Sequence, residues 1–477
     1  MSLWGNRWKQ PLDKTFEEFS FSLSFDKRLW KEDLVGTCAH LLTLKKIGII
    51  KEEEWKVIKD GILELERQIS NDLDIIQGAE DIHTFIEENL TKIAGDFGKK
   101  IHTGRSRNDQ IVLDLKLYLK KEACEIADLL ISLMAELLKL SESYVSTPMP
   151  GYTHLQHAQP VTLGHYFLAY YEMFQRDLER LEDCYKRIDV LPLGCGALAG
   201  SNIPLDREFT AKLLGFSKIA ENSLDAVSDR DFVMEFLFFI TTTFLHLSRL
   251  SEEIILWATK EFSFVDLPEE YSTGSSMMPH KRNPDLAEQT RGKAGRILGD
   301  LFKIMAILKG IPLSYNKDLQ EDKEPVFDAI DQLKLTLRVW IGFLPKLKFK
   351  KERMHELAKN SLLFSTDIAE YLVMKGIPFR EAHKIVGEIV KYCEEMGKNL
   401  ENLTLEEWKK FSSLFADDIL EIFSPEKSIN SKKTLGSPNP LFNKELIDKK
   451  FGYIKEQKFQ WNSKKNSLPT LEKLINL

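Results

Sequence analysis

Three polar segments of the sequence combine residue types that can perform chemistry. The first is IHTGRSRNDQ, residues 101–110, where Ser106, Arg107 and Asn108 stand at the start of a long run without glycine or proline. Backbone N–H groups at the start of a helix and guanidinium groups both attract carboxylates and phosphates. The segment therefore predicts an anion-binding site, although an ordinary helix cap beside a solvated basic turn has the same pattern.

The second segment, PGYTHLQHAQPVTLGH, spans residues 150–165 and contains three histidines. His154 and His157 are expected in a loop before a helix that Pro160 starts at its first turn. A histidine among hydroxyls and amides suits proton transfer near neutral pH. Metal binding by these two residues and His165 is the rival interpretation, but no His-Glu-x-x-His pattern and no Cys or Asp at ligand spacing accompany them. We expect no metal site; a hydrogen-bonded, partly buried imidazole is the structural alternative.

The third segment, STGSSMMPHKRNPDLAE, spans residues 272–288. Gly274 permits a mobile loop, Ser275 supplies a hydroxyl group, and Lys281 supplies positive charge. Together they predict a loop that stabilises an anion or a developing alkoxide. A flexible linker of no chemical role has the same composition.

A helix is expected to begin directly after this loop, with Asn283 as its cap and Pro284 as its first residue. The positive end of that helix would then point at the loop. Glu288 lies one turn beyond Pro284, on a face that can look back toward the loop.

Long helices must position these segments. Residues 105–147 contain neither glycine nor proline, a second such run covers 216–267, and a third helical pattern starts at Pro284 and continues past Gly299 toward Leu308. About 30 residues of helix reach roughly 45 Å, so the pattern predicts a bundle of long helices. Residues 231–250 carry more apolar side chains than one buried face needs, which predicts that other subunits cover part of them.

The composition restricts the class of protein. The chain has 477 residues with 43% hydrophobic residues and only 25 Gly and 17 Pro, which predicts a soluble, helix-rich protein. The formal net charge of -7 makes nucleic acid an unsuitable partner. The five cysteines have no framework spacing, and the first residues lack the apolar stretch of a secretory signal. We therefore expect a cytoplasmic protein that does not span a membrane.

We expect an all-α fold of three helical domains. The divisions are an N-terminal domain over residues 1–104, a central long-helix bundle over 105–353, and a C-terminal domain over 354–477. The two flanking domains have shorter helical patterns that glycine and proline interrupt.

The three polar segments resemble the signature regions of the fumarase/aspartase superfamily. HTGRSRNDQ and GYTHLQHAQP are similar to argininosuccinate lyases in particular, whereas GSSMMPHKRNPD is shared across the superfamily. Four further strings support a resemblance that spans about residues 3–440: LPLGCGALAG (191–200), SDRDFV (228–233), EFSFV (261–265) and YNKDLQEDKE (315–324). One departure is His280, where the lyases usually have Gln; the resulting PHKRNP string also occurs in adenylosuccinate lyases.

The resemblance implies reversible β-elimination of argininosuccinate to arginine and fumarate, without a metal or an organic cofactor. It makes Ser275 the base, with Lys281 favouring the alkoxide and the carbanion. His154, held by Glu288, would protonate the departing guanidino nitrogen or relay a proton through water. The other positions that match the family bind substrate: Ser106, Arg107, Asn108, Thr153, Lys281 and Asn283 at the succinyl carboxylates, and Ser22, Asp81, Tyr315, Gln320 and Lys323 around the arginine part.

The resemblance also implies a homotetramer around the central bundle, with each site assembled from three chains. Two other interpretations stay open: an adenylosuccinate lyase, and a non-enzymatic structural homologue like the lens crystallins related to these lyases.

The run KLKFKKER, residues 346–353, has the charge of a polyanion-binding module. The net charge and the lack of interleaved aromatic residues beyond Phe349 favour a solvated domain junction instead.

Overall fold

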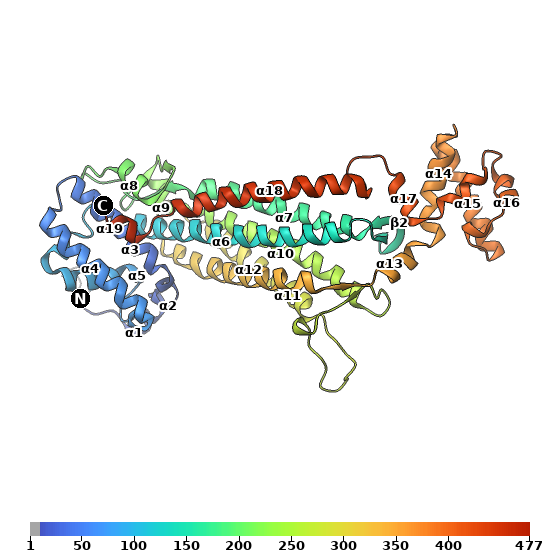
Figure 1. The fold of residues 1–477 in the computed structure, drawn as a ribbon. Helices are drawn as coiled ribbons and strands as arrows, with labels where there is room; N and C mark the ends of the chain where they lie inside the picture. The colour runs from blue at the N-terminus through green and yellow to red at the C-terminus, as the bar shows by residue number, and fades with distance from the viewer. Residues whose placement is uncertain (1–9) are drawn as a thin grey trace.

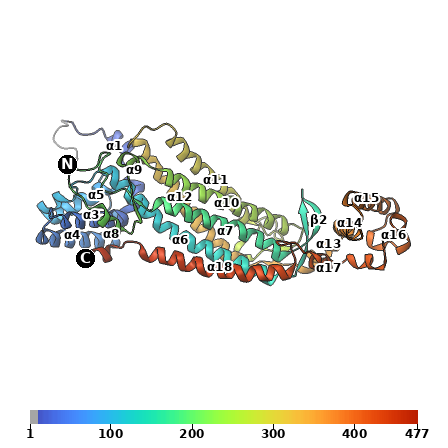
Figure 2. The same cartoon turned by 90° about the horizontal axis from the view of Figure 1, so that it is seen from above.

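The computed structural model describes residues 10–477, and the described chain is almost entirely helical (Figure 1). Residues 1–9, where the expected N-terminal domain begins, lie outside the described residues. Six long helices run along the molecule: α6 (Arg107–Ser143), α7 (Leu163–Ile188), α10 (Asp231–Ala258), α11 (Asp285–Leu308), α12 (Lys323–Phe343) and α18 (Pro440–Ser467). They form an elongated bundle in both views (Figures 1 and 2), which confirms the all-α class and the long-helix bundle.

Helix α6 is 37 residues long, and its start follows from local hydrogen bonds. The Oγ of Ser106 accepts the N–H of Asn108 at 3.3 Å, while the N–H of Ser106 donates to Oδ1 of Asp109 at 3.0 Å. This reciprocal capping satisfies N–H groups that a helix start otherwise leaves unpaired. It therefore sets the start of the helix at Arg107.

Helix α10 is, among residues 10–477, the one helix that is long and apolar enough to cross a membrane. Its side chains Phe236, Ile240 and Phe244 are completely buried against the rest of the bundle. A helix buried in this way is a core helix of a bundle, as the sequence predicts.

Shorter helices cover one end of the bundle. These are α1 (Lys14–Ser20), α2 (Leu23–Asp26), α3 (Trp30–Lys46), α4 (Glu52–Asn71), α5 (Ile82–Ala94), α8 (Arg207–Leu214), α9 (Ser223–Ser228) and α19 (Leu471–Ile475). Short 3-10 helices join or extend helical elements throughout the chain: η1 (Lys27–Leu29), η2 (Leu73–Ile75), η3 (Gly95–Lys100), η4 (Glu269–Tyr271), η5 (Lys317–Asp322), η6 (Leu344–Lys346), η7 (Ser361–Phe364), η8 (Leu400–Asn402) and η9 (Asp417–Ile422).

The opposite end carries a β-hairpin and a separate group of helices (Figure 1). The helices are α13 (Lys351–Ala358), α14 (Ser365–Met374), α15 (Phe379–Met396), α16 (Leu405–Phe411) and α17 (Pro425–Ser431). The antiparallel hairpin consists of β1 (Pro148–Thr153) and β2 (Gln156–Thr162); two further pairs are β3 (Val190–Leu191) with β4 (Lys218–Ile219), and β5 (Val265–Asp266) with β6 (Lys348–Phe349).

The end of the chain differs from the expected C-terminal domain. Residues from 365 to about 423 have a hydrophobic core of their own around Trp408. Helix α18 instead leaves this group and lies along α6 (Figure 1). Its residues Ile447, Ile454 and Trp461 recur every seven positions and are buried in the core of the bundle. That spacing places them on one face of the helix, so the lysine-rich tail adds a helix to the bundle.

Candidate active site

The start of α6 places Arg107 among polar side chains of α5. Its Nη1 donates to Oε1 of Gln110 at 2.8 Å, and its Nη2 donates to the hydroxyl of Thr84 at 3.2 Å. Carboxylates of Asp81 and Glu87 lie 3.6 and 3.5 Å from the guanidinium nitrogens. Because the guanidinium stays partly exposed, it can still meet a carboxylate from solution.

Asp81 and Ser22 lie beside this arginine. Asp81 caps α5 by accepting the N–H of Thr84 at 2.6 Å. Burial alone would raise the pKa of Asp81, but the positive charges of His83 and Arg107 and the bonds from Thr84 lower it below its ordinary value. The backbone N–H of Ser22 donates to the carbonyl of Glu80, the residue before Asp81, at 2.9 Å. The two predicted residues are therefore neighbours.

Three predicted residues of the segment 315–324 join the same region. Nε2 of Gln320 donates to the carbonyl of Ser20 at 3.0 Å, and the Lys323 ammonium donates to Asp322 at 2.8 Å. Burial is the main reason that the pKa of Tyr315 rises to about 12. The negative charge of nearby Asp81 also raises it. The structure thus brings together one end of the predicted substrate site from four distant stretches of sequence: Ser22, Asp81, Ser106, Arg107, Asn108, Tyr315, Gln320 and Lys323.

His154 lies at the tip of the β1–β2 hairpin. His154 and Leu155 have φ angles of 54° and 57°, which is the left-handed pair of a two-residue hairpin turn. Both side chains are exposed, as is that of the adjacent Thr153. Pro160 is part of β2, where it pairs with Pro150, so the expectation that Pro160 starts a helix is wrong. Because residues 156–162 pair in strand β2, helix α7 begins at Leu163, three residues after Pro160.

The metal interpretation of the three histidines has no support in this geometry. His154 is at the hairpin tip, and His157 is on β2 opposite Tyr152. His165 is on α7, where its Nδ1 lies 3.4 Å from Nδ2 of Asn443 and burial lowers its pKa. His165 is therefore a hydrogen-bonded, partly buried imidazole, which is the structural alternative to a metal ligand.

The loop between η4 and α11 extends away from the bundle (Figure 1). Thr273 pairs with Asn283 in an isolated antiparallel bridge, which closes the loop at its base. The Oγ of Ser275 accepts the N–H groups of Met277 and Met278 at 3.3 and 3.0 Å. Two N–H donors on one hydroxyl oxygen favour its negatively charged form.

Two details of this loop differ from the sequence prediction. Helix α11 begins at Asp285, and Asn283 does not cap it, because its amide donates to Oγ1 of Thr273 at 3.2 Å and to the carbonyl of Gly274 at 3.3 Å. Asn283 therefore fixes the base of the loop. Lys281 and Glu288 are both exposed, free to meet a group outside this chain.

Two of the three regions are far apart within one chain. Ser106 lies at the start of α6 and His154 lies beyond its end, and 37 residues of helix measure about 55 Å. Within residues 10–477, no hydrogen bond or ion pair joins His154 to Glu288. One chain alone does not assemble the predicted site.

A buried ionic network beneath Arg107 is absent from the sequence prediction. Nδ1 of His83 lies 2.5 Å from Oδ2 of Asp33 and 3.1 Å from Oδ2 of Asp114, and all three residues are buried. Gln110, which holds Arg107, also donates to Asp33 at 2.7 Å. The sequence signal that could have revealed the network is the presence of Asp33 and Asp114 within otherwise apolar helical runs.

This network is also the described group closest to a metal-ligand set, with one ligand atom from each residue within 4.8 Å of the others. Burial would lower the pKa of His83, but the bonds to Asp114 and Asp33 raise it to about 10. The positive charges of the protonated imidazole and of the buried Arg105 guanidinium disfavour a metal cation here, and burial together with the charge of Asp33 raises the pKa of Asp114. The arrangement fits an internal ion network that supports the first turns of α6.

Comparison with known proteins decides the family. Residues 6–299 match the family model described as Lyase, and residues 362–430 match the one described as Argininosuccinate lyase C-terminal. The argininosuccinate lyase of Carboxydothermus hydrogenoformans is 52% identical over 441 residues, which cover 92% of this chain and 97% of that protein. The chain belongs to the argininosuccinate lyase family. The argininosuccinate lyase of Pelotomaculum thermopropionicum is 50% identical over 456 residues, covering 95% and 99% of the two chains.

Solved structures of other lyases are similar to this chain in fold. An EDDS lyase in complex with formate has a TM-score of 0.86 at 28% identity, covering 98% of this chain and 94% of that one. A fumarate lyase from Mesorhizobium sp. BNC1 has a TM-score of 0.72 at 21% identity, covering 92% and 100%, and so shares the fold. The resemblance drawn from the three polar segments is confirmed.

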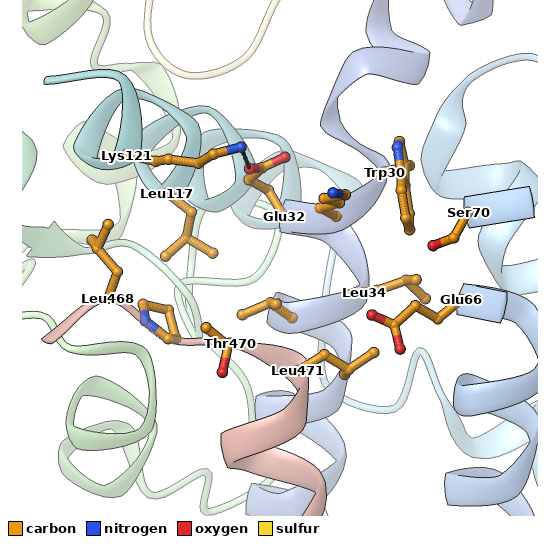
Figure 3. A pocket seen from close by; sticks show the side chains of 13 residues that line it. Trp30, Glu32, Leu34, Glu66, Ser70, Leu117, Lys121, Leu468, Thr470 and Leu471 are labelled. Atoms are coloured by element: carbon orange, nitrogen blue, oxygen red, sulfur yellow. Dashed lines mark ion pairs between the residues drawn. The ribbon is translucent and has the colours of Figure 1, made fainter. Parts of the chain in front are cut away.

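A pocket of about 300 Å³ in this argininosuccinate lyase family member lies away from the predicted site (Figure 3). Trp30, Leu117 and Leu471 line it, and an ion pair of 3.9 Å between Glu32 and Lys121 lies at its edge. None of the residues predicted for chemistry line this pocket. The candidate site is therefore separate from this pocket.

The network around His83 leads to a prediction about stability and pH. Because its folded pKa of about 10 exceeds the ordinary 6.5, its charge stabilises the fold fully below about pH 6.5. That stabilisation is lost as the pH rises through about 10. Thermal unfolding of the wild type is compared with a variant that combines Asp33→Asn, His83→Gln and Asp114→Asn. The wild-type advantage in Tm is expected to shrink by several degrees between pH 7 and 10. An advantage that is the same at both pH values would show that His83 is neutral at pH 7.

Proposed function

We propose that the protein is an argininosuccinate lyase that cleaves argininosuccinate reversibly to arginine and fumarate, without a metal or an organic cofactor. The observation that carries the proposal is the match to argininosuccinate lyases along 92% of the chain at 52% identity. The lyase family match, residues 6–299, includes all three polar segments. Two observations in these segments support the proposal. Buried ionic groups hold Gln110, which contacts Arg107, and backbone N–H groups donate to Oγ of Ser275.

A substrate panel tests this proposal. Argininosuccinate, adenylosuccinate, aspartate and malate are each followed for fumarate by absorbance, with EDTA present. Fumarate and arginine are expected from argininosuccinate, at a rate that EDTA does not change. Faster release from adenylosuccinate would instead make the protein an adenylosuccinate lyase, with His280 as a candidate specificity determinant. Fumarate from none of the four would favour the non-enzymatic, crystallin-like interpretation.

Ser275 is proposed as the base. Its alkoxide removes the proton from the carbon next to a succinyl carboxylate, and the electron pair left on that carbon then expels the guanidino nitrogen. The N–H groups of Met277 and Met278 that reach Ser275 Oγ support this role, since they stabilise the alkoxide. Lys281, six residues along the same exposed loop, adds a positive charge for the alkoxide and for the carboxylate of the carbanion.

His154 is proposed to return a proton to the departing guanidino nitrogen, directly or through water. Glu288 is proposed to orient its imidazole from another chain, because the two residues do not meet within one chain. The exposed, left-handed hairpin turn supports this role, since it holds His154 at the tip of the hairpin. Left-handed backbone conformations of residues other than glycine cluster at functional sites.

The two ends of the substrate are proposed to bind different residues. The succinyl carboxylates contact cations, hydroxyls and amides: Ser106, Arg107, Asn108, Thr153, Lys281 and Asn283. The arginine part lies among acids and neutral donors and beside one ammonium group: Ser22, Asp81, Tyr315, Gln320 and Lys323. The lowered pKa of Asp81 supports this division, since it keeps a carboxylate available for the guanidinium of the substrate.

The assembly is proposed to be a homotetramer around the central bundle. An apolar stripe on α11 supports this, because Leu298, Phe302 and Met305 are 52%, 73% and 50% exposed. On the neighbouring α10, Phe238 and Leu245 are 54% and 48% exposed. Large apolar side chains at helical spacing that face water on two adjacent helices are typical of a surface that another subunit covers.

Replacing Phe302 with aspartate is expected to break the tetramer into smaller species and to abolish lyase activity with it. The charge would be buried without a partner at the proposed contact between subunits. Sedimentation velocity measures the species and fumarate absorbance measures the activity. Leu435→Asp is the matched control, since Leu435 is 91% exposed and lies far along the chain from α11. A tetrameric, active Phe302→Asp variant would contradict the proposed assembly.

We propose a cytoplasmic location, since all five cysteines are free and buried, as suits a reducing compartment. We also propose a division into domains at residues 104 and 353, with helix α18 of the last segment joining the central bundle. The relatives above are bacterial proteins whose names identify them as lyases. No nucleic-acid or membrane partner enters the proposal.

A further inference from the structure

One completely buried carboxylate joins two segments that are far apart in the sequence. Oδ1 of Asp109 accepts the N–H of Ser106 at 3.0 Å within the first turn of α6. Its Oδ2 accepts the N–H groups of Gly194 and Gly196 at 3.0 and 2.8 Å. Asp109 therefore ties the loop 194–200 to the helix start that carries Arg107 and Asn108.

The loop that Asp109 holds also lies directly against the candidate substrate site. Nδ2 of Asn108 donates to the carbonyl of Ala197 at 3.0 Å, and residues 197–200 are exposed beside it. The N–H of Gly200 donates back to the carbonyl of Cys195 at 2.8 Å, which closes the loop into a tight turn. The position of the Asn108 amide thus depends on where this loop lies.

The backbone of the loop has little freedom to lie elsewhere. Gly194 and Gly196 have φ angles of 94° and 61°, in the left-handed region that glycine adopts without strain. A Cβ atom on Gly196 would lie 2.6 Å from the carbonyl oxygen of Gly200. On its other side the loop is held by Arg207, whose Nε donates to the carbonyl of Leu193 at 3.0 Å.

The three N–H bonds favour an ionised carboxylate, because both of its oxygens act only as acceptors. Burial raises the pKa of Asp109 to about 6, against the three N–H bonds and the charge of Arg105, so the group is mostly ionised at neutral pH. An asparagine has one acceptor oxygen, and its NH₂ group would face an N–H donor in place of an acceptor. At least one buried backbone N–H would then lose its partner, which costs free energy.

We propose that Asp109 is a positioning residue of the succinyl-carboxylate site, fixing the loop 194–200 so that Asn108 and Arg107 meet the carboxylates of the substrate in one arrangement. This inference rests on the proposed function, because it assigns the succinyl end to these residues. It makes a selective prediction: binding at the succinyl end depends on Asp109, and binding at the arginine end does not.

Product inhibition of the wild-type enzyme and of Asp109→Asn tests this selectivity. Fumarate occupies the succinyl end and arginine the other end. The inhibition constant for fumarate is expected to rise about tenfold, the effect of losing one buried hydrogen bond. The constant for arginine is expected to stay within about twofold, because its contacts are elsewhere. Glu407→Gln is the matched control, since Glu407 closes the same kind of capping box at the start of α16 and is remote from the site. It should change neither constant.

Gly196→Ala tests the same inference without altering the carboxylate. Its added Cβ displaces the loop, so it should weaken fumarate inhibition more than arginine inhibition. This variant decides the question if Asp109→Asn does not fold. Equal weakening of both products, or no change in either variant while the wild type cleaves argininosuccinate, would overturn the inference. A wild type that releases no fumarate from argininosuccinate would overturn the proposed function instead.

Discussion

Replacing Ser275 with alanine is expected to lower kcat for argininosuccinate cleavage by about 1,000-fold or more, within the range of a lost general base. Substrate binding should stay measurable, because the carboxylate contacts are assigned to other residues. The loss therefore falls on kcat and on kcat/KM together, as for an interaction made only in the transition state. Fumarate absorbance gives the rate, and calorimetric titration of the variant with argininosuccinate gives the binding.

Ser276→Ala is the matched control for this variant. Ser276 is the adjacent hydroxyl, and it is exposed, whereas Ser275 is half-buried and receives two N–H bonds. Its replacement should lower the rate by less than about tenfold, as for a loss of packing or solvation at the loop. Similar large losses in both variants, or normal turnover of Ser275→Ala, would show that the loop presents a different group to the substrate.

The local parts of the fold were predictable from the sequence. The run without glycine or proline over residues 105–147 predicts a long helix that begins near its first residues, and α6 begins at Arg107. The apolar excess of residues 231–250 likewise predicts a helix buried in a bundle, which α10 is. Signals of this kind depend on neighbours within a few residues of each other.

The errors arose where contacts from elsewhere decided the structure. Pro160 has the residue type of a helix start, but pairing with Pro150 places it in a strand. Asn283 has the residue type of a helix cap, but it pairs with Thr273 and its side-chain amide donates a hydrogen bond to the Thr273 hydroxyl. Residues 440–467 were expected in the C-terminal domain, but contacts of Ile447, Ile454 and Trp461 place them along α6.

The same reason limits what the sequence shows of the candidate site. The resemblance supplies Arg107 and Asp81 as substrate positions, but not the ion network that lies beneath them. His83 and Asp33 are 50 residues apart in the sequence and 2.5 Å apart between Nδ1 and Oδ2. Only the packing of α3, α5 and α6 brings them together, and no spacing rule along the chain expresses that packing.

Mixed assembly of two inactive variants is expected to restore activity. His154→Ala and Ser275→Ala should each be inactive alone. If one site takes His154 from one chain and Ser275 from another, some sites in a mixed tetramer receive both intact residues. About a quarter of the sites would do so when chains assort at random in a symmetric oligomer. The assignment of His154 and Ser275 to different chains follows from the proposed site of three chains, and the 37 residues of α6, about 55 Å of helix, already separate Arg107 from the hairpin that carries His154.

Refolding the two variants together tests most directly whether this is an argininosuccinate lyase whose site spans several chains. The variants are denatured, mixed in equal amounts and refolded, and fumarate release from argininosuccinate is measured beside each variant refolded alone. We expect the mixture to recover up to about a quarter of wild-type activity, with both separate samples inactive. A mixture that stays inactive while sedimentation of differently tagged chains shows mixed tetramers would contradict the account, because His154 and Ser275 would then serve one site from one chain.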